Sequence, residues 1–354
     1  MMSSTGLPHL PGEPLRELDA LDLEALRDMI AAAEPVVIRG LVRGWPAVAA
    51  GRQSPVAMAG YLGRFDNGQL VDAIMTPPEV EGRLFYDADM TGFNFIRNRL
   101  GLAAVAEQVL RYANFERAPA VAVQSALVSA CLPGFMAENR LNFLDASIVP
   151  RIWLGTAITT PTHLDEWNNI GCVVSGRRRF TLFPPEQIGN LYIGPIDFAP
   201  TGAPMSLVPL HQPDFARFPR FRRALAVAVS AELEPGDGIF IPPLWWHHVE
   251  SLERFNVLVN YWWNSDPGVE TATDSGFDAL TLAILNLRHL PAPTRRAWRA
   301  LLDHFVFEDP ERALDHIPAH RHGVLGAPAA RALARWRAYL SGKLRADRQR
   351  GSSE

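Results

Sequence analysis

The sequence predicts a mainly β protein: a jelly-roll core with N-terminal α/β elements and a C-terminal helical region. From about residue 119 to 266, short apolar strands alternate with turn-forming groups such as Ser175-Gly176 and Pro235-Gly236-Asp237. Many short strands with few helices between them are typical of a double-sheet jelly roll. On both sides of this stretch, apolar residues recur at helical spacing. The length of 354 residues fits one large domain with an accessory region, or two domains.

The N-terminal part predicts a few mixed elements before the β core. Residues 1–20 are rich in proline and predict an extended arm. Leu21–Glu34 has the spacing of an amphipathic helix, which Pro35 ends, and Pro35–Leu41 then predicts a short buried strand. The next expected elements are a helix at Pro55–Leu62, a strand at Leu84–Asp87 and a helix at Leu102–Tyr112.

The core and the C-terminal region differ in texture. The strands expected in the core are Ala120–Val128, Ile152–Ile158, Gly171–Val174, Arg178–Phe183, Gly238–Ile241, His247–Glu250 and Phe255–Trp263. Residues 184–234 predict a long connection, and such loops are often functional. After Asp266 the expected elements are helices, at Phe277–Leu287, Pro293–Phe305, Glu311–Ile317 and Pro328–Ala346. We therefore expect a domain over residues 21–266, a helical region over 267–346 and a disordered tail over 347–354.

Composition excludes several classes of protein. The net charge of −4 argues against a dominant nucleic-acid or acidic-membrane partner. Cys131 and Cys172 are too few for a disulfide framework or a cysteine-zinc site, which suits a reducing cytosol. No apolar run approaches the roughly 20 residues that span a bilayer, and the N-terminus has no signal-peptide pattern. We expect a cytoplasmic protein.

A histidine and a carboxylate stand two residues apart at His163 and Asp165. In a strand, such residues project from the same face. A second histidine from the later pair His247-His248 would complete a set of two histidines and one carboxylate, which holds Fe(II) and leaves positions open for co-substrate and oxygen. Alternation sends His247 and His248 to opposite faces, and spacing does not choose between them. The alternative is that all these residues are packed or hydrogen-bonded in the core.

Arg178 raises a question of charge. Strand alternation places it on one face with Phe180 and Leu182, and an arginine on an apolar face is costly without an anionic partner. A dicarboxylate bound at its far end by the guanidinium would supply that partner. The alternatives are pairing with an internal Asp or Glu, or an exposed strand whose arginines are solvated.

Ordered motifs along the chain carry a family resemblance. They are Thr160-Pro-Thr-His-Leu-Asp165, Gly176-x5-Leu182-Phe-Pro-Pro185, Pro235-Gly-Asp-x3-Ile241-Pro242, Trp246-His-x-Val249 and Val259-Asn-Tyr-Trp262. Together they resemble the JmjC/cupin-like family of Fe(II)- and 2-oxoglutarate-dependent oxygenases, and within it the asparaginyl hydroxylases of the factor-inhibiting-HIF type. Pro35–Leu41 and Tyr86-Asp87 resemble the N-terminal part of the same family, so the likeness spans roughly residues 20–265.

The resemblance implies a double-stranded β-helix, or cupin, fold with a defined centre. By it, His163, Asp165 and His247 are the catalytic metal ligands, and His248 is a neighbouring or packing residue. The cofactors would be Fe(II), 2-oxoglutarate as co-substrate and O2. Thr160 and Arg178 would bind the distal carboxylate of 2-oxoglutarate. Asn169 and Asn260 match positions that line the metal and co-substrate pocket; the alternative is that they bond to backbone.

Two positions depart from the family pattern. Arg178 stands where the family usually has Lys, which keeps the charge but not the shape. Ala122 stands where a Tyr often helps to bind 2-oxoglutarate, so co-substrate binding would be rearranged or weakened. Candidate substrate contacts are Gln124, Tyr86, Trp167 and Trp262. Tryptophans of this region would form a pocket wall or, alternatively, fill the core.

These residues predict an oxygenase, and specifically a hydroxylase of a protein side chain or small molecule. The substrate is unknown. The resemblance also implies a homodimer formed through the C-terminal helices, the alternative being an intramolecular cap on the barrel. Two other functions stay open: a metal-binding cupin-like protein with chemistry that does not use 2-oxoglutarate, and a ligand-binding or regulatory module that has lost catalysis.

Overall fold

The computed structural model describes residues 13–19, 21–264, 276–326 and 334–342. The chain divides into two compact units, Met1–Glu270 and Thr271–Glu354. In the described residues, every strand belongs to the first unit, and the second is helical. The predicted tail, residues 347–354, lies outside the described residues.

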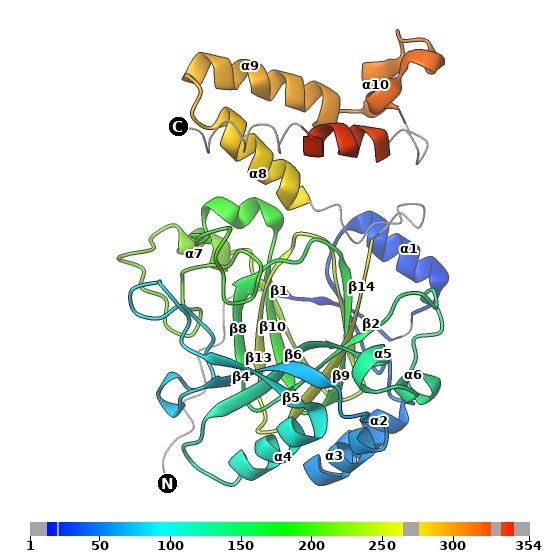
Figure 1. The fold of residues 1–354 in the computed structure, drawn as a ribbon, viewed down its shortest axis with the longest axis vertical. Coiled ribbons are helices and arrows are strands. Elements are labelled where there is room, and N and C mark those ends of the chain that lie inside the picture. Colours follow the sequence, from blue (N-terminus) through cyan, green and yellow to red (C-terminus); the bar gives the residue numbers. More distant parts are fainter. Residues whose placement is uncertain (1–12, 20, 265–275, 327–333, 343–354) are drawn as a thin grey trace. The chain divides into compact units, whose positions relative to one another are not determined.

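Two β-sheets form the framework of the first unit (Figure 1). In the described residues the smaller sheet has five strands, in the order β1 (Glu13–Pro14), β11 (Val229–Leu233), β10 (Arg178–Phe183), β13 (Trp246–Ser251) and β8 (Thr159–His163). The larger has nine in the same residues, in the order β2 (Arg16–Leu18), β3 (Val36–Ile38), β12 (Gly238–Ile241), β9 (Asn168–Ser175), β14 (Asn256–Trp263), β7 (Arg151–Gly155), β6 (Ala120–Leu127), β4 (Leu70–Thr76) and β5 (Ile96–Gly101).

Helices cover one face of the larger sheet. They are α1 (Leu23–Ala32), α2 (Pro46–Gln53), α3 (Pro55–Gly63), α4 (Leu102–Tyr112), α5 (Val128–Cys131) and α6 (Phe135–Glu138). Local sequence sets their ends: the Asp22 side chain accepts from the Ala25 N–H at the start of α1, and Ser54 caps α3 in the same way. Alternate strand residues such as Ile170 and Cys172 point into this apolar layer.

The opposite face of the larger sheet packs against the smaller sheet. Their shared core contains Val173, Ile239 and Leu258 from the larger sheet and Phe180 and Leu182 from the smaller. Two sheets packed face to face with helices outside make a jelly roll, so the predicted fold class is confirmed. The space between the sheets is called the barrel interior below.

Two short strands at the start of the domain cover one edge of each sheet. β1 pairs parallel with β11 of the smaller sheet, and β2 pairs parallel with β3 of the larger. Leu15, between them, is buried in the barrel interior. The part of the predicted extended arm that the structure describes is therefore built into the barrel, because it supplies hydrogen bonds that edge strands otherwise lack.

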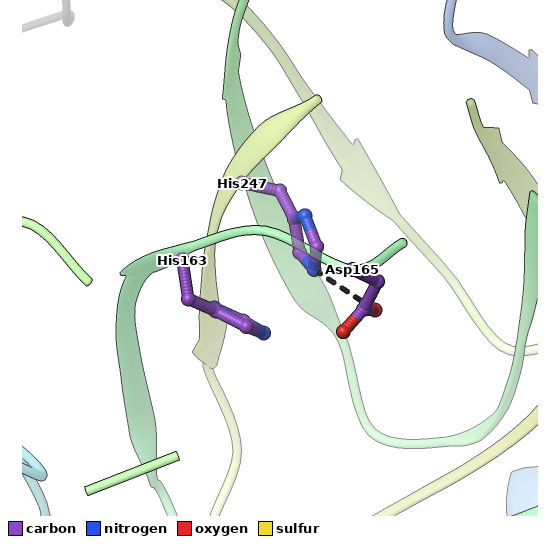
Figure 2. Close-up of side chains that lie close together, drawn as sticks. All are labelled: His163, Asp165 and His247. Carbon is purple, nitrogen blue, oxygen red and sulfur yellow. Dashed lines mark ion pairs between the residues drawn. The ribbon is translucent and has the colours of Figure 1, made fainter. Parts of the chain in front are cut away.

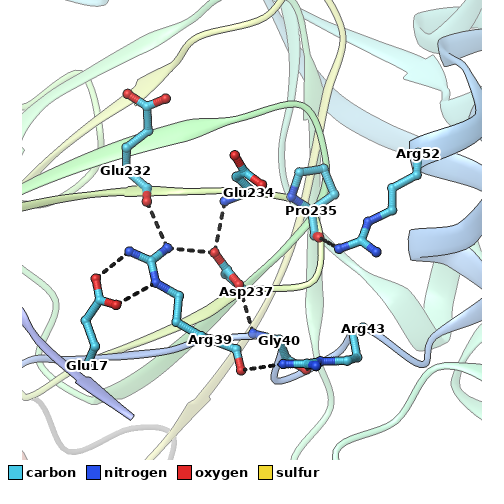
Figure 3. A network of polar contacts seen from close by, with 9 residues as sticks. All are labelled: Glu17, Arg39, Gly40, Arg43, Arg52, Glu232, Glu234, Pro235 and Asp237. Carbon is cyan, nitrogen blue, oxygen red and sulfur yellow. Dashed lines mark hydrogen bonds and ion pairs between the residues drawn. The ribbon is translucent and has the colours of Figure 1, made fainter. Parts of the chain in front are cut away.

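A polar network around Arg39 holds this N-terminal segment in place (Figure 3). The Arg39 guanidinium donates to the Glu17 carboxylate of β2 (Nε–Oε2, 2.9 Å) and to Asp237 (Nη1–Oδ2, 2.7 Å). Asp237 also accepts from the Gly40 N–H at 2.8 Å. The carboxylates on both sides balance the arginine, and the hydrogen bond with Glu17 is the main cause that raises the pKa of Arg39.

Several elements differ from expectation. Leu84–Asp87 is not a strand, because the Phe85 N–H donates to the Asn94 side chain and only isolated bridges form there. The long connection, residues 184–234, contains helix α7 (Phe221–Leu225) and strand β11. Strands β4 and β5 were not predicted.

The second unit contains α8 (Gly276–Leu287), α9 (Ala292–Leu302), a π-helical turn (Asp303–Phe307), α10 (Pro310–Leu314) and a helix at 334–342. Among its described residues, Ala313 is the one buried apolar side chain. Large apolar side chains are exposed instead, including Leu285, Trp298, Phe307 and Trp336.

Candidate metal centre

Three predicted ligands meet at one end of the smaller sheet (Figure 2). His163 ends β8 and His247 lies near the start of β13, and the two are directly opposite in the antiparallel ladder. Residues opposite each other share a face, so both imidazoles project into the barrel interior. Asp165 was expected on the same strand as His163, but it lies beyond the end of β8, in the turn before β9. The Leu244 N–H donates to its carbonyl at 2.8 Å and holds this turn.

The three side chains are close enough to share one ion. One ligand atom from each of His163, Asp165 and His247 lies within 4.8 Å of the others. Nε2 of His247 is 3.6 Å from Oδ2 of Asp165, and the two imidazole centroids are 4.2 Å apart. Ligands about 2 Å from a common metal ion would need only a small adjustment from these separations.

Backbone carbonyls set the tautomer of both histidines. Nδ1 of His163 lies 2.8 Å from the Pro161 carbonyl oxygen, and Nδ1 of His247 lies 3.0 Å from that of Trp245. A carbonyl only accepts, so each Nδ1 carries a proton, and Nε2 is the nitrogen of each ring that is left to bind a metal. Metal-binding histidines are oriented in this way by a partner on the other ring nitrogen.

Burial keeps His163 neutral. Desolvation, followed by the nearby His247, lowers the pKa of His163 to about 4. A neutral imidazole at pH 7 is the form that binds a metal, so no proton has to be displaced from this ring.

His248 faces away from the three ligands. It is opposite Thr181 in the ladder, and Nδ1 of His248 and Oγ1 of Thr181 are buried without a hydrogen-bond partner in the described structure. Burial lowers the pKa of His248 to about 3. The alternation argument is therefore correct in sending His247 and His248 to opposite faces, and geometry joins His247, not His248, to the cluster.

Arg178 lies in the same barrel interior and is buried without a balancing charge. It shares one face of β10 with Phe180, and burial lowers its pKa to about 10. None of the residues that the structure describes forms an ion pair with it, and its Nε has no hydrogen-bond partner. Neither alternative, an internal acidic partner or a solvated strand, is found.

Register relates Arg178 to the histidines. Leu182 is opposite His247, and Arg178 precedes Leu182 by four residues on the same face. At about 3.3 Å per residue, about 13 Å of strand separates the two positions.

A bulge orients Thr160 with these residues. Thr160 is opposite Val249 while His163 is opposite His247, so β8 has one extra residue between the two pairs. Without the bulge, alternation would place Thr160 and His163 on opposite faces. Thr160 is half-buried.

The two predicted asparagines bond to side chains rather than to backbone. Nδ2 of Asn169 donates to Oδ2 of Asp165 at 3.3 Å, and Nδ2 of Asn260 donates to Oδ1 of Asn169 at 3.1 Å. Both are buried in the barrel. The structure thus connects both asparagines to Asp165.

The predicted substrate contacts are more scattered. Gln124 and Trp167 are half-buried, on β6 and in the turn after Asp165. The Tyr86 hydroxyl donates to the Phe198 carbonyl at 2.7 Å, so its proton is already used in a hydrogen bond within the chain. The Arg151 guanidinium lies over the Trp262 ring, with its Cζ atom 5.6 Å from the ring centroid.

Ala122 and the tryptophans are the last predicted positions to be located in the structure. Ala122 is buried among apolar side chains and offers no hydroxyl. Trp246 is fully buried, which is the core-filling alternative, whereas Trp262 is only partly buried.

Sequence analysis missed one polar residue of the interior. Nε1 of Trp153, on β7, donates to Oδ1 of Asn260 at 2.8 Å. Alternation along β7 predicts that Trp153 points to the opposite face of the sheet from Ile152 and Leu154. Nothing in the local sequence predicts that its hydrogen-bond partner is Asn260.

Fold and geometry together define a cupin-type jelly roll with a two-histidine, one-carboxylate cluster in its barrel. The cupin-like domain family matches residues 22–268, so the chain belongs to this family. The finer likeness to hydroxylases of the factor-inhibiting-HIF type stays a prediction.

Named relatives cover part of the chain. HSPB1-associated protein 1 of Bos taurus is 34% identical over 149 residues, 42% of this chain and 30% of that protein. The lysine-specific demethylase JMJ31 of Arabidopsis thaliana is 36% identical over 127 residues, 35% of this chain and 23% of that protein. tRNA wybutosine-synthesizing protein 5 of Gallus gallus is 32% identical over 149 residues, 38% of this chain and 43% of that protein. The matches thus span less than half of each relative.

Within the described residues, no helix is both long and apolar enough to cross a membrane. The cytoplasmic location stays a prediction.

Proposed function

We propose that this chain is an Fe(II)- and 2-oxoglutarate-dependent oxygenase that hydroxylates its substrate. The observation that carries the proposal is the pairing of two features in one barrel: the His163, Asp165 and His247 cluster, and the buried, unbalanced cation of Arg178. One fits a divalent metal with open positions, and the other fits the far carboxylate of a dicarboxylate. Membership of the cupin-like family, with relatives named as demethylases, supports an oxygenase.

The side chains present fit both groups. His163 and His247 would hold the iron through Nε2, since Nδ1 of each is engaged by a carbonyl, and Asp165 would add the negative charge. Arg178 and Thr160 would hold the distal carboxylate of 2-oxoglutarate. When bound, iron and 2-oxoglutarate would activate O2, the oxidant, for chemistry that no side chain provides. The protein's part is to orient these groups and to exclude water with the apolar walls of the barrel.

For the substrate we propose a protein side chain or a small molecule. Gln124, Trp167 and Trp262 are the candidate contacts, since their partial burial leaves part of each side chain accessible. The name of the Arabidopsis relative indicates action on lysine, and the name of the chicken relative indicates a role in tRNA modification. These names differ in substrate class, so they support the shared chemistry more strongly than any one substrate.

An anaerobic titration tests the proposal. Fe(II) followed by 2-oxoglutarate should produce the visible charge-transfer band of the chelated pair. Fe(II) binding without the band on addition of 2-oxoglutarate would favour a cupin-like protein with other chemistry. A band without succinate formation under O2, across protein, peptide and small-molecule candidates, would favour a module that has lost catalysis.

We also propose that the second unit pairs with a second copy of the chain. Its helices leave Leu285 and Phe307 67% and 74% exposed, a pattern expected of a surface that is covered by a partner. Light scattering of the full chain should give twice the 39.2 kDa of one copy. Leu285→Asp with Phe307→Asp should halve that mass, and a monomeric wild-type chain would contradict the proposal.

A further inference from the structure

A chain of three hydrogen bonds runs from an indole to the metal-binding carboxylate. Nε1 of Trp153 donates to Oδ1 of Asn260 (2.8 Å), Nδ2 of Asn260 donates to Oδ1 of Asn169 (3.1 Å), and Nδ2 of Asn169 donates to Oδ2 of Asp165 (3.3 Å). The members come from β7, β14, β9 and the turn before β9. We call this chain the amide relay.

The two ends of the relay give it one direction. An indole N–H only donates and an ionised carboxylate only accepts. Each amide between them must therefore turn its oxygen toward Trp153 and its NH2 group toward Asp165. If either amide flipped, two hydrogen bonds would be lost and an oxygen would face another oxygen.

We propose that Trp153 is a positioning residue of the metal centre, because its N–H fixes both amides so that Asn169 donates to Asp165. The proposal rests on the proposed function, in which Asp165 is a metal ligand. Without the indole donor, Oδ1 of the buried Asn260 has no partner, and its amide loses the preference for the productive orientation. The oxygen that accepts from Asn169, Oδ2 of Asp165, also lies 3.6 Å from Nε2 of His247, so the relay ends on the carboxylate oxygen that faces this histidine.

A second tryptophan provides a matched control. Trp262 contacts Trp153 edge to face, with ring centroids 6.2 Å apart. Its Nε1 has no hydrogen-bond partner in the described structure. Trp262→Phe therefore removes an indole N–H from the same interior without cutting the relay.

The first experiment measures Co(II) binding by visible absorption, which reports both affinity and coordination geometry. Trp153→Phe should lower Co(II) affinity about tenfold and change the shape of the absorption bands, the low end of the range for residues that hold a ligand in place. Trp262→Phe should leave both unchanged. Equal losses in the two variants would overturn the proposal, because the effect would then come from packing.

A double-mutant cycle separates the relay from a general loss of structure. Asn169→Ala removes the last bond and should lower Co(II) affinity about 10- to 100-fold. Adding Trp153→Phe to Asn169→Ala should cost nothing more, since the indole acts only through Asn169. Losses that multiply in the double variant would show that Trp153 acts by another route and would reject the relay.

A measurement without metal tests the relay independently of the proposed function. In protein labelled with ¹⁵N-tryptophan, the Trp153 indole resonance is assigned by its absence in Trp153→Phe. The Trp153 resonance should shift in Asn169→Ala, although the relay joins Trp153 to Asn169 only through Asn260. The Trp262 resonance should not shift. If the wild type bound no Co(II), the proposed function would fail. An unmoved Trp153 resonance would instead disprove the relay, whatever the metal result.

Discussion

Arg39 and Arg178 are two arginines of one barrel, and they differ in how their charge is balanced. Arg39 lies between the carboxylates of Glu17 and Asp237, and hydrogen bonding to them raises its pKa. Arg178 is more deeply buried and has no such partner among the described residues, and burial alone lowers its pKa to about 10. A balanced cation stabilises the fold that balances it. An unbalanced buried cation costs stability and indicates a ligand that brings the missing charge.

The largest expected effect is at the candidate metal centre, the other charged site of the interior. His247→Gln should lower Fe(II) affinity by more than about 100-fold, because removing a ligand exceeds the loss from removing its outer partner. Anaerobic equilibrium titration measures this. His248→Gln is the matched control and should retain Fe(II), since its ring faces away from the cluster. The reverse pattern would exchange the roles of the two histidines.

Next in size is the effect of discharging Arg178. Arg178→Met should raise the apparent Kd for 2-oxoglutarate about 10- to 100-fold, since a hydrogen bond to a charged group contributes about 1.5–3 kcal/mol. Fe(II) affinity should stay unchanged. Titration of the charge-transfer band checks both. Arg179→Met is the control: its guanidinium pairs with Glu232 and Glu250. A Kd equally affected by both variants would refute the role of Arg178.

The comparison predicts opposite signs for stability. Arg39→Met should lower the free energy of unfolding by about 1–3 kcal/mol, because Asp237 loses its charged partner while partly buried. Arg178→Met should leave the ligand-free chain as stable or more stable, since it removes an unpaired buried charge. Denaturant unfolding of both variants without ligand measures the difference. A destabilised Arg178→Met chain would contradict the contrast drawn between the two arginines.

The smallest expected effect is a pH dependence near the Arg39 network. The hydrogen bond from Arg39 is the main cause that lowers the pKa of Glu17 below its ordinary 4.5. The unfolded chain then takes up this proton first as pH falls, so the stability from Glu17 is complete above about 4.5 and is lost below it. Unfolding free energies between about pH 6 and pH 3 should fall less steeply in Glu17→Gln than in wild type. Parallel curves would show that Glu17 contributes nothing.

Much of the fold follows from local pattern. Alternation places Arg178, Phe180 and Leu182 on one face, and the structure buries all three, because the strand period is fixed by backbone geometry. Alternation also predicts that His163 and Asp165 lie together, and they do, but strand alternation is not the cause. β8 ends at His163, and the turn that follows returns the Asp165 carboxylate to the histidines.

Other features depend on partners that sequence alone does not identify. The apolar run Leu84–Asp87 resembles a strand, yet the Asn94 side chain accepts from the Phe85 N–H and takes the place of a neighbouring strand. The bonds of Asn260 to Trp153 and Asn169 join residues 107 and 91 positions apart. Neither separation has a local signature, because only the paired sheet brings β7, β14 and β9 together.

The edge strands β1 and β2 have a practical consequence for anyone who shortens this chain. A protein that began at residue 19 would lose the neighbour of β11 and the neighbour of β3 together, and would lose the Glu17 partner of Arg39 as well. Both newly bared backbones would be free to pair with other molecules, the usual start of aggregation in β proteins. Poor solubility of such a truncated protein would therefore reflect two uncovered strand edges and would not by itself reveal a defect in the candidate metal centre.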